Sequence, residues 1–348
     1  MKKALLFLLL AGSYCQLSLA QNAAEVSRFS KFPEEVSLHL QTLFRMKAPI
    51  ARRMFAVDSS LYIWNEESAN DYAFYRYSLN GQRLSEGLIK GGQGYGQVVG
   101  PMSAGIFQKH TLWVHDIMLE KLVVAEQLKD KTGKDSLVLK EYKLPRFFYS
   151  VQLAEGNRLL GAGAYETPYK IEEVNINSGK DIRQFGAFDK APAGAPFGSW
   201  KHAQEGFLFL QSRGGKLVLA SRFSDRIEIF DLEAQTSRLV KGPENFDFAF
   251  EPIQTGGMDM SMRIDETRFA FSNGAVTDRF IYLLYSGKQH ETGTPNDNET
   301  IYVYSWDGQP VKKMKLDRPV RSFTVSDDDS ILYAYDKKAG AVLSVRIQ

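Results

Sequence analysis

The feature that most constrains this fold is a repeat of about 40 to 50 residues, which fills the sequence after residue 44. Each unit contains short runs rich in Val, Ile, Phe and Tyr, separated by Asn-Gly, Asp-Gly or Ser-Gly turns, as in residues 74–84, 171–182 and 301–311. Such turn residues tolerate the positive φ angles that tight reversals require, so the pattern is typical of strands joined in hairpins. The repeat predicts an all-β chain.

A second pair of strands precedes each of these hairpins, which gives four strands per unit. Examples are the pairs around the turns at 154–157, 213–215 and 327–329. Four antiparallel strands in a unit of this length are typical of a β-propeller blade. We predict a six-bladed β-propeller, with blades near residues 48–88, 102–143, 146–186, 204–241, 268–316 and 319–348. A β-sandwich or a pair of small β domains is the alternative.

The last unit is one strand short, because the chain stops after the run at 341–347. The stretch 35–44 precedes the first blade and would otherwise have no partner, so we predict that it supplies the missing strand. Pairing the two chain ends closes the ring and removes exposed sheet edges. Closure, together with the lack of a Pro- or Ser-rich linker, predicts a single domain over residues 21–348.

The first twenty residues have the pattern of a signal peptide, with two lysines, a short apolar run and a small-residue cleavage site that ends at Ala20. The apolar run is shorter than the roughly 20 residues that a membrane-spanning helix needs, and no later run is longer. We therefore expect export and a soluble periplasmic or extracellular product that begins at Gln21. Lipidation at Cys15 is the less favoured alternative, because the bulky Tyr14 precedes it.

Composition excludes several kinds of site. Cys15 is the only cysteine, so cleavage after Ala20 leaves no disulfide, no thiol nucleophile and no thiolate ligand. The sequence has 43 Lys and Arg against 41 Asp and Glu, and two of the lysines belong to the signal peptide, which leaves 41 of each. A balanced chain does not favour nucleic-acid binding, which usually requires a basic surface.

The sequence also resembles a known family. The segments FIYLLYSGK (280–288) and IYVYSWDGQPVKKMKLDRPVRSFTVSDDDSILYAY (301–335), and the glycine-rich 90–101, are similar to the TolB-like six-bladed propellers exported by Bacteroidetes-type bacteria. Residues 90–101 depart from the family in having Tyr95-Gly96 where a Gly-Pro pair is common. The resemblance implies a propeller over essentially the whole mature chain, and it implies no particular activity, cofactor or ligand.

No local motif predicts catalysis, a cofactor or a metal. The glycines at 91–96 have neither a Rossmann spacing nor a Walker lysine, and the Gly-x-Ser-x-Gly elbow of hydrolases is absent. His110, His115 and Asp116 form the only local histidine cluster. On a strand, His115 and Asp116 point to opposite faces, so the three side chains do not converge on one metal ion. We interpret them as packed or solvated residues.

The lengths of the connections predict which end of the propeller binds a ligand. With strands A to D counted outward from the channel, B-to-C loops and blade-to-blade connections open at one end, and A-to-B and C-to-D turns at the other. The long segments 89–101, 187–203, 242–267 and 286–299 all open at the first end, whereas only 127–135 is long at the second. Elaboration of one face is typical of a binding face.

Aromatic and basic residues on the face with the long connections are the candidate ligand contacts. We place Trp200 and the segment 242–257 near the centre of the site, and as a loop residue Trp200 should matter more for binding than for stability. Aromatic planes beside arginines suit carbohydrate, peptide or aromatic ligands, although such rings can also simply pack the loops. The candidates are Trp64, Tyr95, Arg146, Trp200, His202, Arg222, Phe248 and His290, with Phe246 and Phe250 beside them.

We predict a non-catalytic, monomeric module that binds a glycan, peptide or protein ligand. A carbohydrate-active hydrolase or lyase is the alternative, because glycoside cleavage uses two carboxylates about 5 to 9 Å apart that meet only in space. The acidic residues near B-to-C loops that could form such a pair are Glu66, Glu67, Asp71, Asp116, Glu166 and Asp225. The fold serves both classes and does not separate them.

Overall fold

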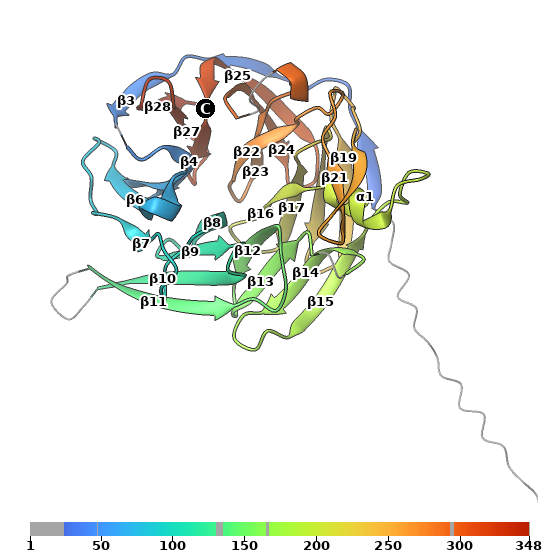
Figure 1. Cartoon of the computed structure of the whole chain (residues 1–348). Helices are drawn as coiled ribbons and strands as arrows, with labels where there is room; N and C mark the ends of the chain where they lie inside the picture. The colour runs from blue at the N-terminus through green and yellow to red at the C-terminus, as the bar shows by residue number, and fades with distance from the viewer. Residues whose placement is uncertain (1–23, 47, 130–134, 165–166, 293–295, 348) are drawn as a thin grey trace, which may run out of the picture.

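The computed structural model describes residues 24–46, 48–129, 135–164, 167–292 and 296–347. Within these ranges, six sheets stand around a central channel (Figure 1), which confirms the six-bladed propeller. The predicted signal peptide, with Cys15, lies outside the described residues. No helix in the described ranges is long and apolar enough to cross a membrane.

The first three blades each consist of four antiparallel strands, at the positions that the repeat predicts. Blade 1 contains β4 (Ala51–Val57), β5 (Ser60–Asn65), β6 (Tyr72–Ser78) and β7 (Leu88–Lys90). Blade 2 contains β8 (Pro101–Phe107), β9 (Thr111–Asp116), β10 (Lys121–Lys129) and β11 (Asp135–Lys143). Blade 3 contains β12 (Ser150–Ala154), β13 (Arg158–Ala162), β14 (Tyr169–Asn175) and β15 (Asp181–Ala187).

The other three blades each include a strand from the N-terminal part of the chain. Blade 4 contains β16 (Gly206–Leu210), β17 (Lys216–Ser221), β18 (Arg226–Asp231) and β19 (Thr236–Lys241), with β1 (Glu25–Arg28) at its outer edge. Blade 5 contains β22 (Phe271–Val276), β23 (Phe280–Tyr285), β24 (Asn298–Ser305) and β25 (Pro310–Val320), with β2 (Glu35–Leu38) outermost. Blade 6 contains β26 (Ser322–Val325), β27 (Ile331–Asp336), β28 (Ala341–Arg346) and β3 (Gln41–Arg45).

The hydrophobic core lies between the blades and not within them. Each of the six buried clusters combines side chains from two neighbouring blades. Between blades 1 and 2, for example, Trp64 and Phe74 share a cluster with Leu112 and Val123. Alternating apolar residues on the strands supply both faces of each sheet, and the burial of these faces is the main favourable term in folding.

The N-terminal segment closes the ring as predicted, but over a shorter range. β3 pairs antiparallel with β28, with Phe44 opposite Val342 and Gln41 opposite Ser344. Residues 35–38 do not take part in this closure, because they form β2 and run parallel to β25 of blade 5. β25 is 11 residues long, and β2 pairs with part of its outer edge as a fifth strand. This pairing satisfies backbone groups of β25 that would otherwise remain unpaired.

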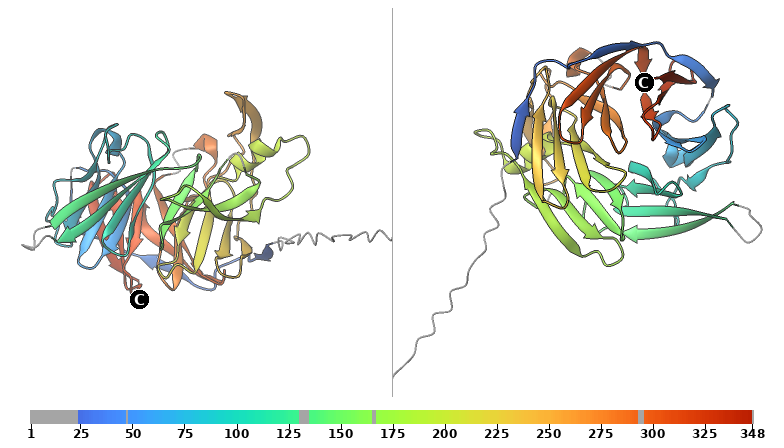
Figure 2. Two further views of the ribbon diagram at one scale, coloured as in Figure 1. Left: turned by 90° about the horizontal axis from the view of Figure 1, so that it is seen from below. Right: turned by 180° about the vertical axis from the view of Figure 1, so that it is seen from behind.

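Two of the long connections contain secondary structure of their own. The connection from blade 3 to blade 4 contains helix α1 (Phe197–Ala203), and that from blade 4 to blade 5 contains the hairpin β20 (Glu251–Thr255) and β21 (Met258–Met262). Both rise from the same end of the ring, as the left view of Figure 2 shows. Of the predicted long segment 127–135, residues 127–129 belong to β10 and residue 135 to β11, and residues 130–134 are outside the described ranges.

Ring closure predicts a difference between two N-terminal deletions. Removal of residues up to Arg28 takes away only the parallel strand β1, so cooperative thermal unfolding should persist. Removal of residues up to Arg45 exposes the edge of β28 and uncovers the cluster that contains Phe44, so aggregation should follow. Thermal unfolding with light scattering measures both, and unchanged melting of the longer deletion would refute the role of β3.

Candidate ligand-binding site

A pocket of about 190 Å³ lies at the end of the ring that carries the long connections. We call it the connection pocket, because residues of the 187–203 and 242–267 connections form much of its wall. Blades 3 and 4 provide the rest. The lining residues are Tyr149, His202, Ala203, Glu205, Arg222, Phe223, Phe248, Ala249, Phe250, Ser261, Met262, Arg263 and Thr267.

A polar network fixes one wall of the connection pocket. Arg222 donates through Nη1 to the Tyr149 hydroxyl and to Glu205 Oε2, the latter at 3.2 Å. The backbone N–H of Ser261 donates to His202 Nδ1 at 3.2 Å, so the neutral imidazole carries its proton on Nε2. Nε2 lies 3.0 Å from Glu205 Oε1. Glu205 is therefore held between a guanidinium and an imidazole.

Arg263 is the least restrained charge of the connection pocket. It follows β21 directly, its side chain is exposed, and its Cζ lies 5.6 Å from the ring centre of Phe223 and 5.9 Å from that of Phe269. No carboxylate of the described ranges forms an ion pair with it. Stacking on aromatic rings leaves the N–H groups at the edge of a guanidinium available to a ligand.

Trp200 is a packing residue beneath the pocket and not part of its wall. It is buried, its Nε1 donates to the Asp189 carbonyl at 2.8 Å, and its ring lies 5.3 Å from Phe248 and 6.1 Å from Phe250. Trp200 therefore belongs to a helix and not to a loop, and its burial predicts a contribution to stability. Its contacts with two wall residues still connect it to the pocket.

The remaining predicted candidates lie apart from the pocket. Trp64 is buried in the core between blades 1 and 2. Arg146 is bound to two carboxylates at 2.6 Å each, Tyr95 is exposed beside β11, and His290 is exposed on a short 3₁₀ turn. Of the residues proposed from the sequence, the connection pocket brings together His202, Arg222, Phe248 and Phe250.

Sequence reasoning missed several residues of the connection pocket, namely Tyr149, Glu205, Ser261 and Arg263. One signal for the last two exists, since Gly256-Gly257 between two short runs is a hairpin pattern. A hairpin there places the residues at the end of its second strand back at the ring surface. Tyr149 and Glu205 have no comparable signal, because each directly precedes an inner strand of its blade.

A larger cavity, of about 500 Å³, occupies the channel itself and opens at the opposite end. We call it the channel cavity. Its walls are the inner strands β4, β8, β12, β16, β22 and β26 with their A-to-B turns, so all six blades contribute. The residues of its inner end are Arg53, Ala104, Gln152, Phe209, Gly274 and Thr324, and those of its mouth include Lys109, Glu155, Arg213, Asp278 and Asp327. The end with the long connections therefore does not hold the larger cavity.

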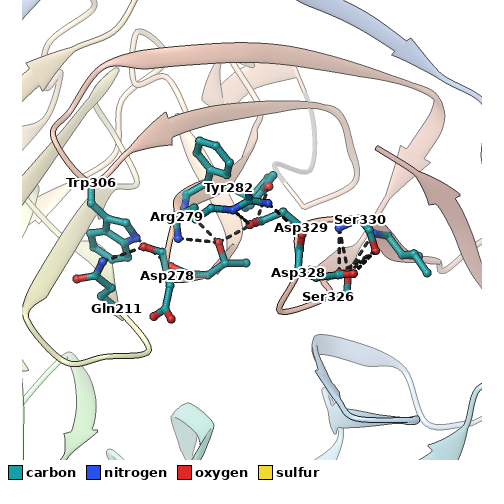
Figure 3. Close-up of polar contacts among 12 residues, drawn as sticks. Gln211, Asp278, Arg279, Tyr282, Trp306, Ser326, Asp328, Asp329 and Ser330 are labelled. Carbon is teal, nitrogen blue, oxygen red and sulfur yellow. Dashed lines mark hydrogen bonds and ion pairs between the residues drawn. The ribbon is translucent and has the colours of Figure 1, made fainter. Parts of the chain in front are cut away.

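The A-to-B turns of blades 5 and 6 are locked together beside the mouth of the channel cavity. The buried Asp329 carboxylate accepts hydrogen bonds from Thr277 Oγ1 at 2.7 Å, Arg279 Nε at 2.8 Å and the Tyr282 hydroxyl at 2.8 Å. Figure 3 shows this network with the neighbouring contacts of Gln211, Trp306, Ser326, Asp328 and Ser330. A carboxylate with three donors from the adjacent blade holds the rim in one conformation.

Each carboxylate that lines one of the two cavities has a hydrogen-bond or ion-pair partner. Asp278 pairs with Arg213 at 2.9 Å and Asp327 with Lys109 at 3.4 Å. Burial raises the pKa of Asp225 to about 6 and also raises that of Glu172, but neither carboxyl lines either cavity. An acid with a raised pKa beside a second carboxylate, as glycoside cleavage requires, is not found on the described walls.

The His115–Asp116 pair is part of the core and of a loop, as the packed interpretation holds. Asp116 accepts the backbone N–H groups of Val99 and Gly100 with one oxygen and those of Met118 and Leu119 with the other. His115 is buried, whereas His110 is exposed in the turn at the other end of β9. The strand thus separates the two histidines that are close in sequence.

Burial of His115 predicts a pH dependence of stability. Burial lowers its pKa from 6.5 to about 4, so the folded state holds the ring neutral while the unfolded chain takes up a proton below pH 6.5. The contribution of His115 to the free energy of unfolding is therefore fully present above about pH 6.5 and falls by about 2 to 3 kcal/mol on acidification to about pH 4.5. Denaturant unfolding of His115→Leu should lack this loss, while the exposed control His110→Leu should retain it. Equal pH profiles in both variants would contradict the assignment.

Two solved structures share the fold. A protein from Bacteroides fragilis NCTC 9343 whose name proposes export is 11% identical with a TM-score of 0.52, over 92% of this chain and 98% of that one. A member of the DUF4221 family from Bacteroides vulgatus is 9% identical with a TM-score of 0.51, over 88% of this chain and 95% of that one. Identities this low show a common fold alone. No curated protein matches the sequence.

The sequence itself matches a family profile, described as TolB-like 6-blade propeller-like, over residues 27–328. This range begins in β1 and extends into blade 6, so the match includes strands of all six blades. The resemblance noted in the C-terminal segments is thereby confirmed along most of the chain. The chain belongs to the TolB-like six-bladed propeller family.

Proposed function

We propose that this protein is an exported, monomeric, single-domain binding module, and that it recognises an acidic sugar residue of a glycan in the connection pocket. The observation that carries the proposal is Arg263, an exposed guanidinium that lines the pocket over two phenylalanine rings without an ion-pair partner in the described ranges. The TolB-like fold provides the scaffold and leaves the ligand open.

Charge and shape of the pocket favour a carboxylate on a small ring. The pocket has two arginines, Arg222 and Arg263, and a single carboxylate, Glu205, which already has two partners. Its net charge therefore favours an anion. A guanidinium binds a carboxylate through two parallel N–H donors. The rings of Phe248 and Phe250 supply the apolar faces on which sugar rings stack. The volume of about 190 Å³ suits one residue of a longer ligand, since whole drug-sized ligands occupy roughly 300 to 1,000 Å³.

Two further observations support a binding role without turnover, outside the cell. Three of the four carboxylates on the pocket and cavity walls are paired with cations, namely Glu205 with Arg222, Asp278 with Arg213 and Asp327 with Lys109, so these three are poorly placed to act as acid and base. The N-terminal pattern of two lysines, an apolar run and a small-residue site favours export. The name of the Bacteroides fragilis structure points the same way.

Binding of short polygalacturonate oligosaccharides, with neutral galactan oligosaccharides alongside, tests the proposed ligand. Calorimetry should show binding of the acidic chain and about tenfold or greater weakening in Arg263→Gln, because a hydrogen bond to a charged group contributes about 1.5 to 3 kcal/mol. Arg213→Gln is the matched control, an exposed arginine at the opposite end of the ring. Equal binding of the neutral chain, or no effect of Arg263→Gln, would contradict the proposal, and cleavage of either chain would support the hydrolase or lyase alternative.

The buried position of Trp200 predicts a stability effect. Trp200→Ala removes the ring between Phe248 and Phe250 and should lower the free energy of unfolding by about 3 kcal/mol. Tyr95→Ala is the control, because Tyr95 is 69% exposed and its loss should change little. Thermal and denaturant unfolding measure both. Unchanged stability of Trp200→Ala with lost oligosaccharide binding would instead mean that the indole itself contacts the ligand.

A further inference from the structure

The channel cavity contains a charged side chain that has no role in the binding site proposed above. Arg53 belongs to β4, the inner strand of blade 1, and lines the inner end of the cavity. Its Cζ lies 4.8 Å from the ring centre of Phe209, on the inner strand of blade 4. Blades 1 and 4 are three positions apart in a ring of six, so the arginine reaches across the channel.

Arg53 differs from the other basic residues of the cavity in having no acidic partner. Lys109 pairs with Asp58 at 3.0 Å and with Asp327 at 3.4 Å. Arg158 pairs with Glu173 at 2.7 Å and Arg213 with Asp278 at 2.9 Å. For Arg53, neither a hydrogen bond nor an ion pair joins the guanidinium to another residue of the described ranges.

The charge of Arg53 persists despite its surroundings. Burial, with a smaller contribution from neighbouring Arg52, lowers its pKa to about 10, so the guanidinium remains ionised at neutral pH. A partly desolvated cation without a counter-charge is costly, and a bound anion would remove that cost. The cavity provides the room for such an anion, because its volume of about 500 Å³ lies within the range of ligand sites, roughly 300 to 1,000 Å³.

The walls and the mouth restrict the chemistry of that anion. Near Arg53 the walls carry no other charge, and they combine apolar side chains such as Ala104 and Phe209 with the neutral polar Gln152 and Thr324. The mouth holds three carboxylates, Glu155, Asp278 and Asp327, together with the cations Lys109, Arg158 and Arg213, so its charges balance and Arg53 provides the unpaired charge of the cavity. One unpaired cation at the inner end, uncharged walls with several apolar side chains and a charge-balanced rim suit an anion with a single charge and a largely apolar body.

We propose that the channel cavity is a second ligand site, independent of the connection pocket, which takes an organic monocarboxylate. Its carboxylate binds the guanidinium of Arg53, and its apolar body lies along the inner strands toward the mouth. The planar fork of an arginine matches the two oxygens of a carboxylate, and stacking on Phe209 holds the fork in place. The locked turns around Asp329 keep the entrance open in one shape.

Calorimetry with 3-phenylpropionate and its neutral isostere 3-phenylpropionamide tests this site. The acid should bind saturably, with an affinity about tenfold or more above that of the amide, because only the acid pairs with a guanidinium. Arg53→Met removes the charge and keeps an apolar stem against Phe209, so it should reduce acid binding by about tenfold or more with little change in melting temperature. Arg263→Met, in the connection pocket, should leave it unchanged.

The outcomes separate the two sites. Equal affinity for acid and amide, no saturable binding of the acid, or full binding by Arg53→Met would each overturn the channel site. Loss of acid binding in Arg263→Met with retention in Arg53→Met would overturn it too, and would place the carboxylate in the connection pocket. A destabilised Arg53→Met would be replaced by Arg53→Lys, in which a single point charge should still favour the acid but less strongly than arginine does.

Discussion

Each blade of this propeller depends on its neighbours for a hydrophobic core, since all six apolar clusters are shared between two blades. A blade at an open end would leave one apolar face in water. Pairing of β3 with β28 prevents this, because it builds the sixth blade from both ends of the chain and brings Phe44 into the cluster with blade 1. The channel cavity depends on this closure, because the inner strands of all six blades form its walls.

The two cavities arise in different ways. The channel cavity follows from the repeat itself, because six inner strands enclose a space that their own side chains do not fill. The connection pocket is built from α1, the segment around Phe248 and the end of β21, which lie outside the repeat. Changes in these inserts can therefore alter the pocket without a change in the blades. Arg53, by contrast, lies on a strand that the ring requires.

The fold was predictable from the sequence and the site largely was not. Hairpins are local, so turns such as 327–329 mark adjacent strands directly, and the unpaired stretch before blade 1 indicated closure. The pairing of β2 with β25 could not be predicted, because a parallel edge strand is not joined to its partner by a turn that the sequence would show. Burial of Trp200 has no signal in the local sequence, because it depends on contacts with Phe248 and Phe250, which lie far along the chain. Arg53 was missed because nothing in a strand sequence shows that its side chain lacks a partner.

The closing strand also sets the order in which this chain can finish folding. β3 is synthesised early, yet its partner β28 lies about 300 residues later, so blade 6 forms only when the whole chain is available. Until then, β3 is an unpaired edge, and the faces of blades 1 and 5 that blade 6 will cover remain exposed. An incomplete chain therefore leaves an unpaired strand and apolar sheet faces, both of which favour association between chains. A factor that shields the N-terminal segment until the last strand emerges would act at the step where this architecture is most vulnerable.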